Sequence, residues 1–245
     1  MPGSTQSRPS LHLIHDCNLI ITGHLFRVVI DLIFTVRRNK MRFLRRGIQQ
    51  MKSPREQAIF ARPTRRMMVF VDGENLVFRY QNMVNNGFVP RDEMKHEPDV
   101  FVWFDGFTHL GQQHEIIRTT YYTYVVGDDL RVTNIRNQLR SMQFSKHMAS
   151  LLPNTLSPCV FKKDQRSRSG KGVDIQLSVD MMSHVFRGNV DSILLLSGDG
   201  DYAPLLDEVK RAGILVYVSA FSDGFSSSLK DRADAVYELD GTTWK

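Results

Sequence analysis

The chain has few cysteines, few glycines and prolines, and no long uninterrupted hydrophobic run. Its 245 residues include two cysteines, Cys17 and Cys159, without a CxxC pair or a Cys/His spacing typical of zinc ligands. This excludes a disulfide scaffold and a zinc ribbon, and it favours a reducing, cytoplasmic location. The 16 glycines and nine prolines are too few for a fibrous protein. We therefore expect a globular cytoplasmic protein.

The most apolar segment, 19–36, is interrupted by His24, Arg27 and Asp31. A charged residue at the centre of a membrane helix costs ~2.5–3.5 kcal/mol, which largely cancels the apolar gain of this segment. The segment also lacks the order of regions that defines a secretory signal. We expect no membrane span.

Positive charge is concentrated at the start of the chain. Residues 1–66 carry 13 Lys/Arg against 3 Asp/Glu, a net of +10, whereas residues 67–245 carry 19 against 23, a net of −4. The basic run 37–46 would suit a membrane-surface helix or a nucleic-acid-binding arm. We favour a simpler interpretation, in which 1–66 is a poorly ordered extension or precedes the natural start. The pI of 9.4 then says little about the domain at 67–245.

Strand and helix patterns alternate from residue 67 onward, in a composition (42% hydrophobic, 24% charged) typical of globular domains. We expect strands at 67–71, 116–126, 155–161, 192–196, 214–220 and 235–239. We expect helices at 74–85, 128–146, 173–186, 202–212 and 226–233, and an irregular insertion at 88–114. This alternation predicts an open, mostly parallel α/β sheet with helices on both faces.

Acidic residues follow two of the predicted strands. The strand 67–71 runs directly into Asp72, and the strand 192–196 is followed by Asp199 and Asp201 in a glycine-containing turn. Ligands of such sheets bind at the carboxyl ends of the strands. If the two strands are neighbours, these carboxylates share one small space.

A third acidic position, Asp174, begins a predicted helix just after the basic loop 162–172. Clustered carboxylates either take up protons or bind a cation, and Mg²⁺ or Mn²⁺ suits oxygen ligands. Such an ion activates water and binds the oxygens of a phosphodiester. Arg166, Arg168 and Lys171 in the loop would add phosphate contacts.

Each of these residues also has a purely structural interpretation. Asp72, Asp199 or Asp201 would serve as a helix N-cap, and Asp174 would be favoured by a helix dipole. The basic loop would then be an ordinary solvated loop. Asp180 lies six residues after Asp174, about 240° around a helix, so we expect it to face elsewhere. The joint placement of the other acids at strand ends is what favours a site.

Three segments resemble, in order, the motifs of NYN domains of the LabA-like group, within the PIN-like nuclease superfamily. The first is 69–75 (VFVDGEN), and the second is 171–174 (KGVD) followed by Asp180. The third is 195–202 (LLSGDGDY) followed by Pro204 and Leu205, which is the most specific of the three. A closing segment at 228–234 is also similar. The resemblance covers roughly 67–240.

The resemblance implies a Rossmann-like PIN fold, an RNA substrate and a ribonuclease site that uses Mg²⁺ or Mn²⁺. It assigns the metal site to Asp72, Asp174, Asp199 and Asp201. Asn75 would orient the site or the phosphate, and Ser197 would support the loop.

Two alternatives to a nuclease stay open at the level of sequence. One is a regulatory or RNA-binding module that retains the acids without appreciable turnover. The other is a receiver-like domain in which Asp72 accepts a phosphoryl group, although the second and third acidic motifs have a less natural role there. Whether the chain forms a homo-oligomer is also open.

Overall fold

The computed structural model describes residues 65–109, 114–144, 154–163 and 171–245. The expected extension at 1–66 therefore lies almost wholly outside the described residues, and its separation from the rest of the chain stays a prediction. Arg166 and Arg168 also lie outside them, as does the side chain of Lys171. Across the described ranges, no helix is long and apolar enough to cross a membrane.

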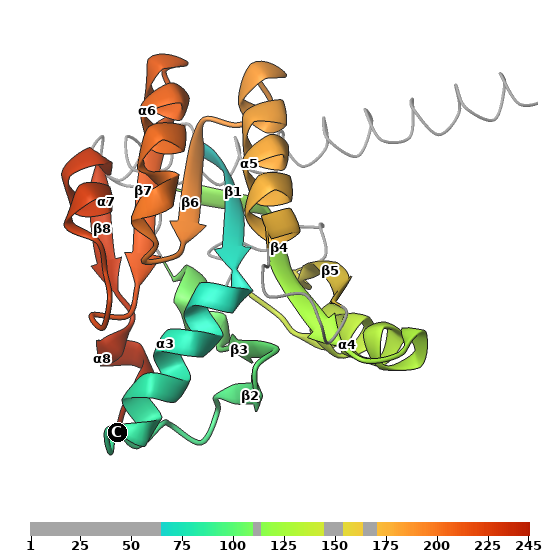
Figure 1. The fold of residues 1–245 in the computed structure, drawn as a ribbon. Helices are drawn as coiled ribbons and strands as arrows, with labels where there is room; N and C mark the ends of the chain where they lie inside the picture. Colours follow the sequence, from blue (N-terminus) through green and yellow to red (C-terminus); the bar gives the residue numbers. More distant parts are fainter. Residues whose placement is uncertain (1–64, 110–113, 145–153, 164–170) are drawn as a thin grey trace, which may run out of the picture. The chain divides into compact units, whose positions relative to one another are not determined.

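Within these residues six strands form one sheet in the order β5-β4-β1-β6-β7-β8, and all neighbours are parallel (Figure 1). The strands are β1 (Arg65–Asp72), β4 (His114–Val126), β5 (Ser157–Lys163), β6 (Ser192–Leu196), β7 (Leu215–Ala220) and β8 (Ala235–Glu238). The expected open parallel α/β sheet is confirmed, with strand positions within a few residues of those predicted.

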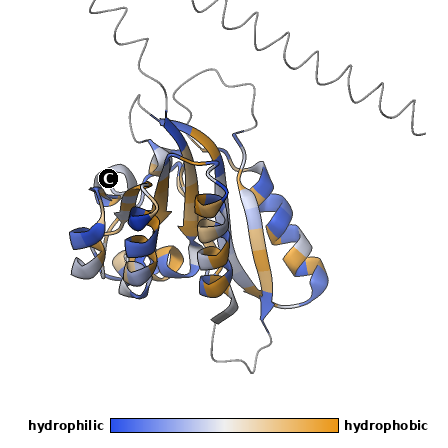
Figure 2. Cartoon of the chain, turned by 90° about the horizontal axis from the view of Figure 1, so that it is seen from above, coloured by the Kyte–Doolittle hydropathy of each residue, from blue (hydrophilic) through white to orange (hydrophobic). Residues whose placement is uncertain are grey.

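Helices cover both faces of this sheet. They are α3 (Gly73–Asn85), α4 (Asp129–Ser141), α5 (Lys171–Phe186), α6 (Ala203–Arg211), α7 (Ser227–Arg232) and the short α8 (Asp240–Thr243). The buried residues of α3 and α4 join one hydrophobic cluster, and those of α5, α6 and α7 join another. Hydrophobic residues concentrate in the strands between them, whereas the helices mix hydrophobic and hydrophilic residues (Figure 2).

The alternation of side chains along β1 explains the two clusters. Val69 and Val71 belong to the cluster beneath α3 and α4, while Met68 and Phe70 belong to the cluster beneath α5 and α6. A strand covered on both faces is apolar at successive positions, because successive side chains point to opposite faces. This is why the continuous apolar run in the sequence indicates a central strand.

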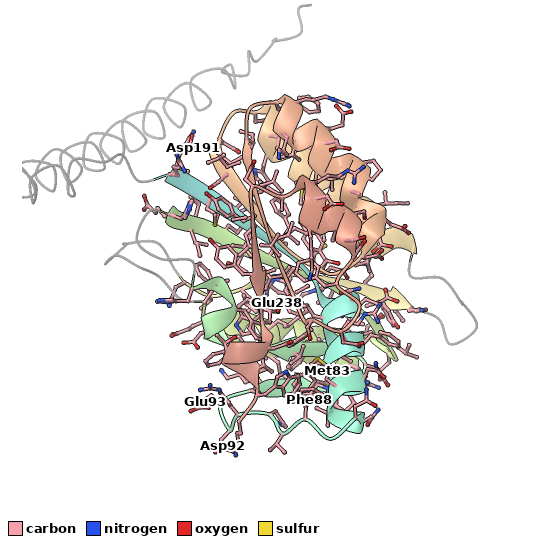
Figure 3. The ribbon with its side chains drawn as sticks, turned by 90° about the vertical axis from the view of Figure 1, so that its left-hand side faces the viewer. Met83, Phe88, Asp92, Glu93, Asp191 and Glu238 are labelled. Atoms are coloured by element: carbon pink, nitrogen blue, oxygen red, sulfur yellow. The ribbon has the colours of Figure 1, made fainter. Side chains whose placement is uncertain are left out.

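The order of the strands reverses direction beside β1. From β1 the chain adds β4 and β5 on one side, and α5 then carries it across to β6 on the other side. The space between the carboxyl ends of β1 and β6 is therefore a topological switch point, the usual ligand position in such sheets. At the opposite end of the sheet, the exposed carboxylate of Asp191 accepts two hydrogen bonds from the Arg66 guanidinium. Figure 3 shows Asp191 and Met83 toward opposite ends of the molecule.

The segment 88–114 is more regular than predicted. It contains an antiparallel pair, β2 (Lys95–Glu97) with β3 (Phe101–Trp103), and a 3-10 helix η1 (Asp105–Thr108). Trp103 is buried and its indole N–H donates to the carbonyl of Gln143 at 2.7 Å. The hydrophobic cluster beneath α3 thus extends into this segment, although its short strands give little periodicity in the sequence.

The helix α5 occurs where its apolar spacing predicted it, but it buries a different face. The spacing that predicts this helix is that of Ile175, Val179, Met182 and Phe186, yet Ile175, Val179 and Phe186 are 62%, 57% and 78% exposed and Met182 is only partly buried. The buried stripe is instead Val173, Leu177, Met181 and Val185. A helix with apolar residues on several faces does not reveal its packing direction, because periodicity alone then fits more than one stripe. The helix α4 is also shorter than predicted, ending at Ser141 rather than near Lys146.

Candidate acidic site at the sheet switch point

Asp72 is the last residue of β1 and the N-cap of α3. Its side chain is 2% exposed, and its Oδ1 accepts a hydrogen bond from the backbone N–H of Asn75 at 3.1 Å. The following residue must be glycine, because a Cβ on Gly73 would lie 2.3 Å from the ring of Tyr121. The strand therefore turns into the helix with its carboxylate held inside the protein.

Two side chains join this turn to the loop after β6. The hydroxyl of Ser197 donates to Oδ2 of Asp72 at 2.8 Å and accepts from the backbone N–H of Asp199 at 3.1 Å. The Oδ1 of Asn75 accepts from the backbone N–H of Gly198 at 2.9 Å. The structure thus brings the first and third sequence motifs together, and both Asn75 and Ser197 hold the loop in place.

Asp199 begins the 3-10 helix η2 (Gly200–Tyr202), and its Oδ1 accepts from the backbone N–H of Asp201 at 3.0 Å. The capping interpretation is therefore correct in geometry for both Asp72 and Asp199. Each oxygen of a carboxylate can accept more than one bond, so a cap does not exclude a second role. Asp201 itself is exposed at the rim.

Asp174 approaches the same place from the first turn of α5. Its Oδ1 accepts a hydrogen bond from the phenol of Tyr202 at 3.1 Å. Asp180, as expected, faces a different group: its carboxylate accepts from the phenol of Tyr122 at 2.9 Å and from the amide of Gln176 at 2.8 Å.

Burial and mutual repulsion perturb the acids. Burial raises the pKa of Asp72 to about 7, and the charges of Asp174 and Asp199 add to this, against the hydrogen bonds from Asn75 and Ser197. Partial desolvation likewise raises the pKa of Asp174, as do Asp199 and Asp201. The carboxylates therefore lie within one another's electrostatic range. Perturbed carboxyl groups in a switch-point position mark a functional-site candidate.

Two residues of the site carried no assigned role in the sequence. Burial and the neighbouring charges of Asp72 and Asp174 raise the pKa of the Tyr202 phenol, so this ring lies among the acids as a neutral donor. Burial also raises the pKa of Glu74, which Lys163 lowers and Asp174 raises. The only signal for Glu74 was its position two residues after Asp72, and for Tyr202 its place in the third motif.

The oxygen-rich set of side chains fits a hard divalent cation in chemistry. Among the described residues, however, no three His, Cys, Asp or Glu side chains come close enough to hold one ion together. The side chains of Asp72, Asp174, Asp199 and Asp201 thus lie near one another without forming such a group, and their joint role as metal ligands stays a prediction. Mg²⁺ ordinarily keeps several waters and uses one or two protein carboxylates, which the pair Asp72 and Asp199 or the nearby Asp174 can supply.

The comparisons with known proteins agree with this fold. The family model for the NYN domain matches residues 66–240, so the chain belongs to the NYN domain family. The NYN family and the parallel α/β sheet are both consistent with membership of the PIN-like nuclease superfamily.

Individual relatives add little to the family assignment. An uncharacterised protein of Methanocaldococcus jannaschii is 34% identical over 71 residues, which is 29% of this chain and 30% of that protein. A protein of unknown function from Vibrio parahaemolyticus has a solved structure with a TM-score of 0.49 and 19% identity, covering 80% of this chain and all of its own. A putative oxidoreductase from Parabacteroides merdae covers 72% of this chain and 32% of its own, with a TM-score of 0.28 and 10% identity.

Ser197→Ala is expected to destabilise the fold by roughly 1–3 kcal/mol, because it leaves a buried carboxylate and a backbone N–H without their partner. Urea unfolding at pH 8 measures this. The matched control is Ser192→Ala, at the other end of β6. Ser192 is equally buried, but its hydroxyl contacts lie at 3.5 Å, the limit of a hydrogen bond. Equal losses in the two variants would contradict the role given to Ser197.

Proposed function

We propose that this chain is a divalent-metal-dependent endoribonuclease that uses Mg²⁺ or Mn²⁺ to hydrolyse RNA phosphodiester bonds. The observation that supports it most is the buried carboxylate of Asp72, which shares its electrostatic field with Asp174 and Asp199 at the switch point of an NYN-family sheet. Burying a carboxylate beside other carboxylates is costly, and a bound cation offsets that cost. The cytoplasmic location and the oligomeric state stay predictions.

In this proposal one or two carboxylates of the set Asp72, Asp174 and Asp199 bind the ion directly, the others act through its water ligands, and Asp201 lies at the rim. The ion supplies an activated water and stabilises charge on the phosphate. Asn75 and Ser197 keep the loop after β6 in register with Asp72, through the 2.9 Å and 2.8 Å hydrogen bonds described above. A fixed arrangement of charges avoids the reorganisation that flexible groups undergo during reaction.

Tyr202 has a positioning role in the same proposal. Its phenol stays protonated at neutral pH, because burial and the surrounding acids raise its pKa. It therefore donates to Oδ1 of Asp174 and restricts the orientation of that carboxylate. Asp174 remains open to solvent, so its other oxygen is available to bind an ion or a water.

Metal removal tests the proposal. A circular, unpaired RNA has no ends, so its linearisation reports endonucleolytic cleavage alone. We expect cleavage in Mg²⁺ or Mn²⁺, loss of cleavage in EDTA, and recovery when the metal is returned in excess. Cleavage that continues unchanged in EDTA would exclude the mechanism. RNA that is bound but left intact in both metals would instead support the regulatory alternative.

A further inference from the structure

A cation and an aromatic ring lie together at the carboxyl ends of β4 and β5. The Lys163 ammonium sits 4.0 Å from the centre of the Tyr124 ring. Both residues lie near the carboxyl ends of their strands, where Tyr124 pairs with Phe161 and Val126 pairs with Lys163. Both are only partly buried, so the pair faces solvent at the same edge of the sheet as the acids.

This pair adjoins the acidic site through Glu74. Glu74 follows Asp72 by two residues. Besides burial, which raises the pKa of Glu74, the charge of Lys163 lowers it and that of Asp174 raises it. The neighbouring Lys162 lies on the other face of the sheet, where its ammonium forms a 2.8 Å ion pair with Asp129 of α4. Successive side chains of a strand point to opposite faces, which separates the two lysines. Lys163 therefore places positive charge next to the acids, whereas Lys162 does not.

A second pair lies about one helical turn along α3 from the acids. Phe78 and Arg79 follow Asn75 by three and four residues, so they share its side of α3. Phe78 is 60% exposed, and the Arg79 guanidinium lies 5.3 Å from the centre of its ring. Arg79 also approaches Asp223, at 3.8 Å, in the loop after β7.

The loop after β7 places this second pair relative to the site. The backbone N–H of Ser226 donates to the carbonyl of Gly198 at 3.0 Å, so the loop packs directly on the turn that carries Asp199. Along the sheet order, β5 and β4 lie on one side of β1, and β6 and β7 lie on the other. The first pair, on β4 and β5, and the second, on α3 beside the loop after β7, therefore both lie at the carboxyl edge of the sheet that carries the acids.

We infer that Lys163 with Tyr124, and Arg79 with Phe78, form two nucleotide subsites that hold an unpaired RNA strand beside the acidic site. This inference rests on the proposed function and names the groups that position its substrate. At each subsite the cation contacts a phosphate and the ring stacks on a base, the combination by which proteins bind single strands without reading sequence. A base already stacked within a duplex is not free to stack on a side chain, so paired RNA is a poor ligand.

The subsites also resolve a difficulty in the charge distribution. The acids repel the phosphates of RNA, and residues 67–245 carry a net charge of −4. Two cations near the acids, each next to an aromatic ring, attract the strand close to the cleavage position. RNA binding then does not require a broad basic patch, because charge and stacking act together at the two subsites that position the strand.

Fluorescence anisotropy tests the subsites with the full chain carrying Asp199→Asn, so that RNA stays intact in Mg²⁺. The probe is a labelled unpaired RNA of about twelve nucleotides, compared with the same strand in a duplex. We expect Lys163→Ala, Tyr124→Leu and Phe78→Ala each to weaken binding of the unpaired strand by roughly tenfold, and the duplex to bind more weakly than the single strand. Leucine preserves the apolar contacts of the partly buried Tyr124.

Two controls separate charge from packing. Lys162→Ala and Tyr124→Phe are expected to bind RNA like the parent. The first removes a lysine that belongs to neither subsite, and the second keeps the aromatic ring at position 124. Lys163→Ala should also lower the slope of log Kd against log salt by about 0.7, the value for one phosphate contact on a single strand, whereas Tyr124→Leu should leave the slope unchanged.

The outcomes distinguish this inference from the catalytic proposal. If the wild type cuts no RNA and the three variants still lose binding, the subsites stand and the nuclease proposal fails. If the wild type cuts RNA in a metal-dependent way while the three variants bind like the parent, the subsites are overturned. Loss of binding in Lys162→Ala equal to that in Lys163→Ala would also overturn them, because it would indicate general charge attraction.

Discussion

Asp199→Asn is expected to lower the rate of RNA cleavage by at least about a hundredfold in saturating Mg²⁺, and Asp72→Asn by a similar factor. Loss of one well-placed charged group from a catalytic centre commonly has an effect of this size. The asparagine side chain at 199 keeps an oxygen that can accept from the backbone N–H of Asp201, so the loop should keep its shape. Initial cleavage rates across a series of Mg²⁺ concentrations measure the effect.

The matched control for this loss is Asp191→Asn, the same chemical change at the opposite end of the sheet (Figure 3). Asp191 forms an exposed ion pair with Arg66, and such pairs contribute little to stability. Cleavage by this variant should match the wild type. Equal losses in the three variants would trace the effect to the fold, and full activity in Asp72→Asn and Asp199→Asn would exclude the acidic site as the catalytic centre.

Asp72→Asn is also expected to stabilise the metal-free protein at pH 8, by up to about 4 kcal/mol. The carboxyl group has a pKa of about 7 in the folded protein, against an ordinary value of 3.8, because it is buried. The folded state therefore binds this proton more tightly than the unfolded state does. Stability attributable to Asp72 is largest at acidic pH, and it is lost as the pH rises from about 4 through 7.

The pH dependence supplies the internal control for this prediction. At pH 5 Asp72 carries its proton in the folded state, so the asparagine variant should differ from the wild type far less than at pH 8. Urea unfolding in EDTA at both pH values measures the difference. An equal effect at the two pH values would show that packing, and not the buried charge, is responsible. Excess Mg²⁺ at pH 8 should stabilise the wild type more than Asp72→Asn, since the ion favours the charged carboxylate.

Together these two predictions state that the charged Asp72 carboxylate lowers the stability of the metal-free fold and is needed for cleavage. A residue that destabilises the fold when charged, and whose neutral replacement removes both the cost and the activity, is serving the chemistry rather than the fold. The same substitution would then raise the free energy of unfolding while it lowers the rate of cleavage. Few purely structural residues would behave in this way, because a helix cap replaced by a weaker cap loses stability.

Much of the fold was predictable because its signals are local. The apolar run before Asp72 and the one before Ser197 each indicate a buried strand, and the glycines beyond them indicate tight turns. Helix positions followed from apolar spacing even where, as in α5, that spacing pointed to the wrong face. The motif order that identifies the NYN family is likewise a property of the sequence alone. These features depend on residues close together in the sequence, and the period of the apolar pattern can be recognised without knowledge of the tertiary structure.

Only the tertiary structure decided which distant residues meet. That β1 and β6 are neighbours places Ser197 against Asp72, 125 residues apart, and this contact with burial sets the pKa of the carboxyl group. The roles of Tyr202, Glu74 and Lys163 arise in the same way, since each acts through a group on another element. A sequence states which side chains can ionise, whereas burial and distance decide at what pH they do so, because desolvation and Coulomb interactions depend on spatial surroundings.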